Sequence, residues 1–344
     1  YRNGNDGDIY GLFFGSNGEV QPVDSSEADG AFPISKNPGS VYIPAVSYNY
    51  NQGIFLAVWQ ENRDGTPDIY GQRIAFNGEL LPAPGASDSK ENFPVDNNVD
   101  FDEGVPDVGY NPVTDEWFVV YARKVEHNNS SILGRRLDYE GNIVNDQGES
   151  IGGAPADTPP ITISELTGNN PDGAQVRVQF NTEPGIDLNE PGVRLSECLV
   201  VWNFKQLDAR DIHGQRVAFL SNPSGNYETT FIDSLCEITS PDRSNFPVSN
   251  AEGNQAVCSI SYSMLDNEFL TGWGDARSKM WSQQDLYCQR LQVQPDSAML
   301  WLNEDQSTEI TPNMNFPVDT TDAYEGNLVC SAHNSKRNEF FVVY

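Results

Sequence analysis

One long phrase returns several times along this chain, and this repetition constrains the fold more than any other feature. The first copy reads PAVSYNYNQGIFLAVWQENRDGTPDIYGQRIAFNGE from Pro44, and the second reads PDVGYNPVTDEWFVVYARKVEHNNSSILGRRLDYEGN from Pro106. Two further copies contain ECLVVWNFKQLDARDIHGQRVAF and CSISYSMLDNEFLTGWGDARSKMWSQQDLYCQRLQV. Repeats of this length indicate a fold that is assembled from one recurring supersecondary unit.

A short separator precedes each copy and allows the repeats to be counted. It occurs as Phe32-Pro33-Ile34, Phe93-Pro94-Val95, Phe246-Pro247-Val248 and Phe316-Pro317-Val318, with Ile161-Thr162-Ile163 in the remaining position. The last copy lacks the DIYGQR half of the phrase, and the chain begins with YRNGNDGDIYGLFFGSNGE, which is that half. When Tyr344 is joined to Tyr1, the separators are 61, 68, 85, 70 and 60 residues apart, which together equal the 344 residues of the chain. Five units therefore close a circle.

Each unit holds about four short β segments, because aromatic and β-branched residues alternate and Asn-Gly or Glu-Gly turns separate the segments. Four antiparallel strands repeated around an axis predict an all-β fold, a five-bladed β-propeller. We expect its last blade to be latched two strands plus two by the chain ends, and its fourth strands to lie between the Asn-Gly turn and the next separator. We expect one domain over 1–344, with blades at 32–92, 93–160, 161–245 and 246–315 and a last blade formed by 316–344 and 1–31.

The unit P-x-V-x-Y-N … F-L-V-V-W-x-D-x-R … D-I-Y-G-Q-R … N-G resembles the propeller repeat of large secreted and cell-surface proteins of bacteria and archaea, over essentially the whole chain. The resemblance implies an extracellular or cell-surface location. It also implies a non-catalytic binding or scaffold domain of a larger polypeptide, with a protein or a polysaccharide as its partner. Because propellers host many unrelated activities, the repeat indicates architecture more strongly than function.

An enzymatic alternative stays open, because five-bladed propellers include glycoside hydrolases of the arabinanase and levansucrase type, in which carboxylates line the axial channel. Such an enzyme needs two opposed carboxylates. The expected channel strand carries one acid in its five copies, Asp107. The corresponding positions hold Ala45, Arg177, Ser259 and Cys330, and nearby loops hold Asp102, Glu103, Glu252, Asp322 and Glu325. His127, His213 and His333 fall at unrelated positions and indicate no nucleophile or metal constellation, so we expect no catalytic centre.

Charge narrows the partners further. The chain has 50 acidic and 20 basic residues and a net charge of -30. Binding to nucleic acid requires the opposite sign and is therefore excluded. No apolar run reaches the roughly 18 residues of a membrane span, so we expect no membrane insertion of this domain. An acid-rich surface serves solvation or attracts cations.

One loop is rich in oxygen ligands. The segment RNGNDGD offers Asn3, Asn5, Asp6 and Asp8, and shorter versions occur at Asp64 with Asp68 and at Asp208 with Asp211. Alternating Asp and Asn residues around a Gly suit Ca²⁺, which takes six to eight oxygen ligands. A solvated Asx-turn is the alternative, since the loop lacks the bidentate Glu of an EF-hand.

Two kinds of residue recur at fixed positions of the repeat. An aromatic residue recurs at Trp59, Tyr121, Trp202, Trp273 and Tyr344, and an Arg recurs at Arg73, Arg136, Arg216 and Arg290. Repetition in every unit favours packing between sheets over a sugar-stacking role for the aromatic residues. We expect the Arg side chains to bridge neighbouring blades through their planar guanidinium groups.

The cysteines and sequons give candidate modifications. Cys258 and Cys330 fall on expected inner strands of adjacent blades and are candidates for a disulfide, while Cys198, Cys236 and Cys288 have no evident partner. Asn128 and Asn129 each begin an N-x-S/T sequon and are candidates for glycosylation.

Overall fold

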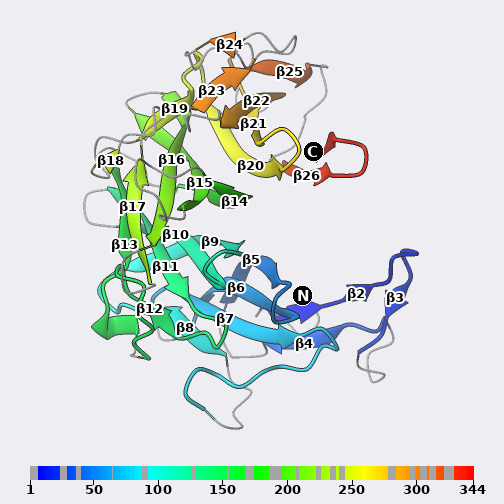
Figure 1. Ribbon diagram of the computed structural model, residues 1–344, viewed down its shortest axis with the longest axis vertical. Coiled ribbons are helices and arrows are strands. Elements are labelled where there is room, and N and C mark those ends of the chain that lie inside the picture. The colour runs from blue at the N-terminus through cyan, green and yellow to red at the C-terminus, as the bar shows by residue number, and fades with distance from the viewer. Residues whose placement is uncertain are drawn as a thin grey trace. The chain divides into compact units, whose positions relative to one another are not determined.

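The computed structural model shows a chain built from short β-strands (Figure 1). It describes residues 7–23, 29–35, 40–63, 65–86, 92–124, 129–152, 155–166, 174–185, 195–206, 209–221, 226–232, 238–239, 245–277, 284–293, 299–302, 308–309, 315–320 and 329–344. Within these residues the only helical element is a 3-10 turn at Pro155–Asp157, and no helix is long and apolar enough to cross a membrane. The prediction of an all-β fold is confirmed.

The chain divides into two compact units. Unit 1 comprises 1–123, 135–145 and 150–160, and unit 2 comprises 124–134, 146–149 and 161–344. The antiparallel sheets follow one plan in both units. In the four larger sheets, consecutive strands of a repeat pair in the order of the sequence, as in a meander and as in the blades of a propeller, while β1-β4, β2-β3 and β26-β27 are two-stranded.

The first strands belong to unit 1. They are β1 (Ile9–Gly11), β2 (Phe13–Phe14), β3 (Val20–Gln21), β4 (Phe32–Ser35), β5 (Ser40–Asn49), β6 (Ile54–Asn62), β7 (Asp68–Ala75) and β8 (Phe93–Asp96). Strands β5 to β8 form a four-stranded sheet in sequence order, while β1 pairs with β4 and β2 pairs with β3. The second repeat contributes β9 (Asp102–Asn111), β10 (Glu116–Lys124), β11 (Ser130–Leu137), β12 (Ile143–Val144) and β13 (Ile161–Leu166), in the order β12-β11-β10-β9 with β13 against β11. Of these, β13 and the first part of β11 belong to unit 2.

The remaining strands belong to unit 2. The third repeat has β14 (Val176–Gly185), β15 (Leu195–Gln206), β16 (Ala209–Ser221), β17 (Tyr227–Ile232), β18 (Ile238–Thr239) and β19 (Phe246–Ser249). The fourth has β20 (Gln255–Ser263), β21 (Glu268–Asp275), β22 (Asp285–Val293), β23 (Met299–Leu302), β24 (Thr308–Glu309) and β25 (Phe316–Asp319). Strands β26 (Cys330–Asn334) and β27 (Glu339–Val343) form a hairpin.

In the sheets of the second, third and fourth repeats, two separate segments pair with the third strand, each along one half of it. The sequence-based expectation had a single fourth strand there. In the fourth repeat, the second half of β22 pairs with β23 (Arg290↔Leu302), and its first half pairs with the Phe-Pro strand β25 (Cys288↔Phe316). The Phe-Pro strand β8 likewise pairs with β7. The Phe-Pro segments are therefore strands of the sheet that precedes them, and not only separators. Proline is tolerated there because these short strands lie at sheet edges, where a missing N–H breaks no ladder.

The recurring aromatic residues pack in the sheet cores. Trp59, Tyr121, Trp202 and Trp273 are fully buried, which confirms the packing interpretation for these four positions. Tyr344 differs, since it is half exposed and its hydroxyl donates to Oδ2 of Asp319 at 2.6 Å. The central strand β6 is buried on both faces, which explains its uninterrupted apolar run IFLAVW.

The strand that opens each of the first two repeats carries a kink at one equivalent position. Ile43 in β5 and Val105 in β9 have φ values of 54° and 55°, and each precedes a proline. A positive φ is strained for β-branched residues and is held only where the surrounding structure determines it. The kink in β9 separates Glu103 from Asp107, two acids of the candidate site described next.

Candidate active site

A cluster of carboxylates and guanidinium groups is buried in unit 1. Nε of Arg123 lies 2.7 Å from Oε1 of Glu103, and Nη2 of Arg123 lies 2.9 Å from Oδ2 of Asp96. Nη2 of Arg135 lies 3.4 Å from the same oxygen of Asp96. The Glu103 side chain is 0% exposed and that of Asp96 is 1% exposed, so solvent does not screen the cluster.

The order of the strands explains why these residues meet. In an antiparallel pair, the start of one strand and the end of the next strand lie at the same end of the sheet. Asp96 ends β8, Glu103 begins β9 and Arg123 lies near the end of β10, while Asp68 begins β7. The cluster is further connected by a backbone hydrogen bond from the amide N of Glu103 to the carbonyl O of Pro67, at 2.8 Å. Residues distant in sequence are thereby brought to one face of unit 1.

The electrostatics of the cluster favour a neutral Glu103. Burial raises the pKa of Glu103 to about 8, Asp96 and Asp68 raise it further, and Arg123 opposes the rise. Burial and the negative charges of Asp96 and Asp68 together outweigh the guanidinium of Arg123, although its Nε lies only 2.7 Å from Oε1 of Glu103. Oε2 of Glu103 and Oδ1 of Asp96 are buried and make no hydrogen bond in the structure. A proton on Oε2 of Glu103 removes the excess charge.

Aromatic side chains enclose the cluster. The hydroxyl of Tyr121 donates to Oδ2 of Asp96. Burial, followed by the charge of Asp96, raises the pKa of Tyr121 well above its usual value, so the phenol remains a donor. The guanidinium of Arg123 lies 4.8 Å from the ring centroid of Phe101, and the Arg123 side chain is 12% exposed. Arg123 is therefore the member of the cluster that reaches solvent.

The other repeats show that this cluster is a departure from a common arrangement. In the first repeat, Nε1 of Trp59 donates to Glu61 at 2.8 Å, and Arg63 binds the same carboxylate at 2.8 Å and lies 3.6 Å from the ring of Tyr70. In the fourth repeat, Trp273, Asp275, Arg277 and Tyr287 repeat these contacts. The motif W-x-[DE]-x-R thus supplies one acid to one arginine.

The second repeat has Tyr121-Ala122-Arg123 at this position and lacks the acid of the motif. Two acids from neighbouring strands, Asp96 and Glu103, take its place. The missing acid alone could not have indicated this cluster, because the third repeat has Phe204 at the same position and lacks the acid as well.

The acids considered from the sequence have different positions. Asp107, the candidate catalytic residue, is half-buried in β9 just beyond the kink, and Asp102 and Glu252 are exposed. Asp322 and Glu325 lie outside the described residues. Of the acids considered, Glu103 therefore has the most perturbed environment, and Asp107 lies on the same strand.

The predicted metal loop is described only in part. Asn3, Asn5 and Asp6 lie outside the described residues, as do Asp64 and Asp208, and Asp8 is half-buried. Among the residues that the structure describes, no group of three His, Cys, Asp or Glu side chains could hold a metal ion. The Ca²⁺ site at RNGNDGD stays a prediction.

The cysteine prediction is wrong in this structure. Cys258 and Cys330 are both free thiols, the first buried and the second exposed. Sγ of Cys258 instead lies 3.6 Å from the carbonyl O of Gln175 and 3.8 Å from that of Val201, a residue of the neighbouring sheet of the third repeat. Cys198 and Cys288 are also free and buried, and burial raises the pKa of the Cys288 thiol to about 12. These buried thiols are unreactive at neutral pH.

The prediction for the recurring arginines is corrected for three positions. Arg136, Arg216 and Arg290 bind Glu116, Glu197 and Glu268 at 2.8, 2.7 and 2.6 Å, and each partner lies on the adjacent strand of the same sheet. Arg73 does bridge two repeats, because Nη1 donates to the carbonyl O of Tyr139 at 3.0 Å.

The histidines and sequons add no chemistry to the site. His213 is stacked on Trp202, and burial lowers its pKa to about 4, while His333 lies on the hairpin β26–β27. His127 and Asn128 lie outside the described residues, and Asn129 is half-buried. Glycosylation at Asn128 or Asn129 stays a prediction.

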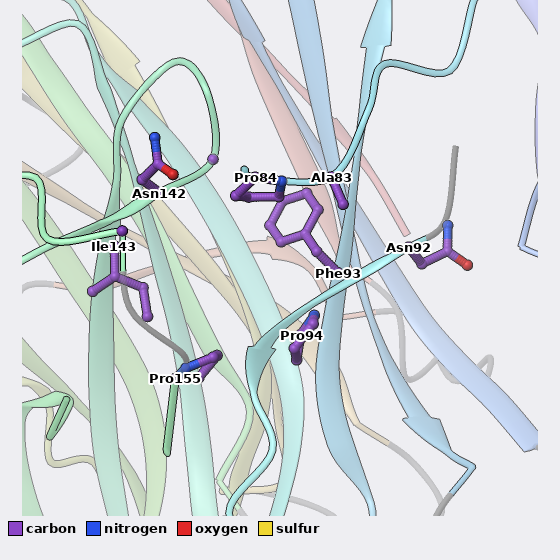
Figure 2. A pocket seen from close by; sticks show the side chains of 10 residues that line it. Ala83, Pro84, Asn92, Phe93, Pro94, Asn142, Ile143 and Pro155 are labelled. Atoms are coloured by element: carbon purple, nitrogen blue, oxygen red, sulfur yellow. The ribbon is translucent and has the colours of Figure 1, made fainter. Parts of the chain in front are cut away.

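A pocket of about 400 Å³ lies next to the cluster in unit 1. The described residues that line it are Ala83, Pro84, Asn92, Phe93, Pro94, Gly141, Asn142, Ile143, Gly152 and Pro155. Figure 2 shows Pro84 and Phe93 on one side of the pocket, with Asn142 and Ile143 on the other. Phe93 and Pro94 belong to β8, the strand that ends in Asp96.

Comparisons with known proteins return similarity in structure alone. No protein-family model matches the chain, and no curated protein matches it. A Hadza microbial sialidase shares 11% identity at a TM-score of 0.39, over 85% of this chain and 61% of that one. The endo-1,5-α-L-arabinanase of Thermotoga petrophila shares 12% identity at 0.34, over 75% and 62%. An α-L-arabinofuranosidase of Podospora anserina shares 9% identity at 0.36, over 84% and 72%.

These comparisons correct the functional expectation. The three solved structures named above are described as enzymes that act on carbohydrate. The expectation of a non-catalytic binding or scaffold domain is contradicted by these descriptions. The chain spans less than two thirds of the sialidase and arabinanase chains, and similarities this low assign no activity to it.

Proposed function

We propose that this chain is a glycoside hydrolase that acts on a polysaccharide, with Glu103 as the general acid and Asp107 as the second carboxylate. The observation that carries the proposal is the full burial of Glu103 beside Asp96 and Asp68, whose charges raise its pKa. A general acid must hold its proton near neutral pH, and two fixed negative neighbours in a dry site keep a carboxyl protonated. The raised pKa of Glu103 meets this requirement.

The two carboxyl groups have distinct environments, as acid and base roles require. Glu103 is fully buried, whereas Asp107 is half-buried on the same strand. In the proposed reaction the Oε2 proton of Glu103 passes to the glycosidic oxygen as the bond to the anomeric carbon breaks. Asp107 removes a proton from the water that attacks this carbon, so that one water is consumed for each bond cleaved.

The spacing of the two acids predicts the stereochemistry. Four residues of extended strand span about 13 Å, and the kink at Val105 shortens this distance. Retaining enzymes hold their carboxyl groups roughly 5 Å apart, while inverting enzymes need about 6.5–9.5 Å for the water. The wider spacing favours inversion at the anomeric carbon.

Access to Glu103 requires a movement of Arg123. The Glu103 side chain is 0% exposed, and Arg123, packed on Phe101, separates it from solvent. In the proposal, the bound substrate displaces the Arg123 side chain and takes up the hydrogen bond at Glu103. The movement exposes the acid only while substrate excludes water, which preserves its raised pKa.

The proposal includes a five-bladed ring that is closed by the two chain ends. The recurrence of the separators, 60 to 85 residues apart around the closed chain, supports five units. Two apolar faces, each exposed within its own unit, support closure: Phe341 and Val343 are 67% and 52% exposed on β27, and Tyr42 and Val46 are 46% and 63% exposed on β5. Isolated exposed apolar residues are common, but contiguous faces mark surfaces that become covered. An extracellular or cell-surface location is part of the proposal, because polysaccharide substrates occur there.

A substrate screen tests the proposal. The purified chain is incubated with arabinan, levan and a sialylated glycan, and the release of reducing ends or free sugar is measured. We expect turnover of at least one substrate and its loss in Asp107→Asn. The matched control is Asp102→Asn, an exposed acid of the same strand, which should leave the rate unchanged. A rate that is equally reduced by both substitutions contradicts the assignment of Asp107.

A further inference from the structure

The pocket beside β8 has an unusual lining for this protein. The chain carries a net charge of -30, yet the described lining residues are three prolines, two glycines, two asparagines, one alanine, one isoleucine and one phenylalanine. A volume of about 400 Å³ lies in the range of small-molecule sites, which combine apolar walls with a few polar groups. An uncharged wall in so acidic a protein disfavours an ionic ligand and suits a neutral one.

Glycine keeps the pocket open. Gly141 has a φ of +83°, and a Cβ at this position would lie 3.1 Å from Cγ of Pro84 and 3.2 Å from Cζ of Phe93. Any other residue would therefore be strained and would push against the pocket wall. The wall itself is made rigid by Arg73, whose Nη1 and Nη2 donate to the carbonyl oxygens of Tyr139 and Pro82.

One polar side chain of the pocket, that of Asn142, has a fixed orientation. Nδ2 of Asn142 donates to Oδ2 of Asp138 at 3.0 Å, which directs the amide nitrogen toward that carboxylate. The amide oxygen then remains as an acceptor, and Figure 2 shows it on the side of Phe93. An oriented acceptor beside proline and phenylalanine faces suits a ligand that has both hydroxyl groups and an apolar C–H face.

The pocket is connected to the carboxylate cluster by one buried residue. Nη2 of Arg135 donates to the carbonyl O of Pro155, which lines the pocket, at 2.9 Å. The same guanidinium lies 3.4 Å from Asp96, and Arg135 is 2% exposed. A ligand that presses on Pro155 is therefore linked through Arg135 to the residues around Glu103.

We propose that this pocket is a binding subsite for one uncharged sugar unit, with Phe93 and the prolines against its C–H face and Oδ1 of Asn142 accepting from a hydroxyl. The inference rests on the proposed hydrolase function, whose polysaccharide substrate would supply the sugar. The subsite holds a sugar unit of the polysaccharide away from the bond that is cleaved, and it is separate from the general acid Glu103.

Isothermal titration with arabinotriose and xylotriose tests the subsite, with trigalacturonic acid as a charged comparison. Ala83→Trp fills the pocket from a half-buried position, and Ala86→Trp places the same side chain at an exposed position three residues away. We expect saturable binding of a neutral trisaccharide, weakened at least tenfold by Ala83→Trp and less than about twofold by Ala86→Trp. Circular dichroism confirms that both variants are folded.

The result is read separately from hydrolysis. Binding is measured in Glu103→Gln, so that it does not depend on turnover. A folded wild-type protein that binds sugar without cleaving any supports the subsite while contradicting the hydrolase. Absence of binding up to about 10 mM, a limit near the weakest specific affinities, overturns the subsite. Binding that Ala83→Trp leaves unchanged, or that trigalacturonic acid alone shows, also overturns it.

Discussion

Nε of Arg123 donates to Oε1 of Glu103 across 2.7 Å, and this hydrogen bond joins the end of β10 to the start of β9. This hydrogen bond favours the ionised carboxylate, and burial together with Asp96 and Asp68 outweighs it in raising the pKa of Glu103. Its structural consequence is that an acid expected in a loop is held fully buried, next to Asp96 and Asp68.

The first prediction concerns the pH dependence of stability. The pKa of Glu103 is raised from 4.5 to about 8 in the folded chain, so the folded state holds a proton that the unfolded state has lost. The contribution of Glu103 is fully present below pH 4.5 and decreases as the pH rises toward 8. The free energy of unfolding should fall by about 1.4 kcal/mol per pH unit from this residue alone.

Chemical denaturation of the wild type and Glu103→Gln between pH 5 and pH 8 measures this slope. The glutamine mimics the neutral acid and should remove the slope while keeping the stability seen at pH 5. Parallel curves for the two proteins would show that Glu103 is ionised throughout and would exclude it as an acid.

The second prediction concerns the recurring acid–arginine pair. Glu61 is fully buried and receives hydrogen bonds from Trp59 and Arg63, so Arg63→Ala leaves an uncompensated buried charge. We expect a loss of roughly 3 kcal/mol in the free energy of unfolding. Arg337→Ala is the control, because its pair with Glu339 is exposed and should contribute less than about 1 kcal/mol. Equal losses for the two variants, measured by urea denaturation, would contradict a special role for the buried pair.

Much of the fold followed from the repeats, whereas the site did not. The buried aromatic positions Trp59, Trp202 and Trp273 could be predicted because every repeat imposes the same packing there. The Phe-Pro segments are expected only as separators, yet they form edge strands of the sheets, where proline breaks no hydrogen-bond ladder.

The cluster around Glu103 depends on strands β7, β8, β9 and β10 meeting at one face, and no local pattern encodes such a meeting. Tyr121-Ala122-Arg123 lacks the acid found in the first and fourth repeats, but Trp202-Asn203-Phe204 of the third repeat lacks it too, so this pattern does not single out the second repeat. Cys258 and Cys330 were paired from expected positions on inner strands, but strand position does not specify how two side chains are directed.

The third prediction tests the closed ring. If β27 is covered by the strands of the N-terminal half-blade, Phe341→Asp buries a charge and should lower the melting temperature by several degrees. Phe76→Asp is the control, since Phe76 is 75% exposed on unit 1 and no repeat partner is expected for it. Equal melting temperatures for Phe341→Asp and Phe76→Asp would contradict the closure of the ring by the two chain ends.

The fourth prediction concerns Ca²⁺ at RNGNDGD. If the loop binds the ion, chelation with EDTA at low salt should lower the melting temperature. The free energy of unfolding should fall by about 2.7 kcal/mol when Ca²⁺ had been at a hundredfold excess over Kd. The double substitution Asp6→Ala and Asp8→Ala should remove this sensitivity. A melt that chelation leaves unchanged assigns these acids to solvation.

The most direct test of the hydrolase is the pH profile of glycoside cleavage by the wild type and Glu103→Gln, on the substrate that the screen identifies. With Glu103 as the acid, the wild-type rate should fall above pH 8 as the proton is lost. The glutamine variant should lose at least a hundredfold in rate, about 2.7 kcal/mol, while Asp102→Asn retains full activity. Cleavage by Glu103→Gln at the wild-type rate, or the absence of cleavage by a folded wild-type chain on every polysaccharide of the screen, would contradict the account.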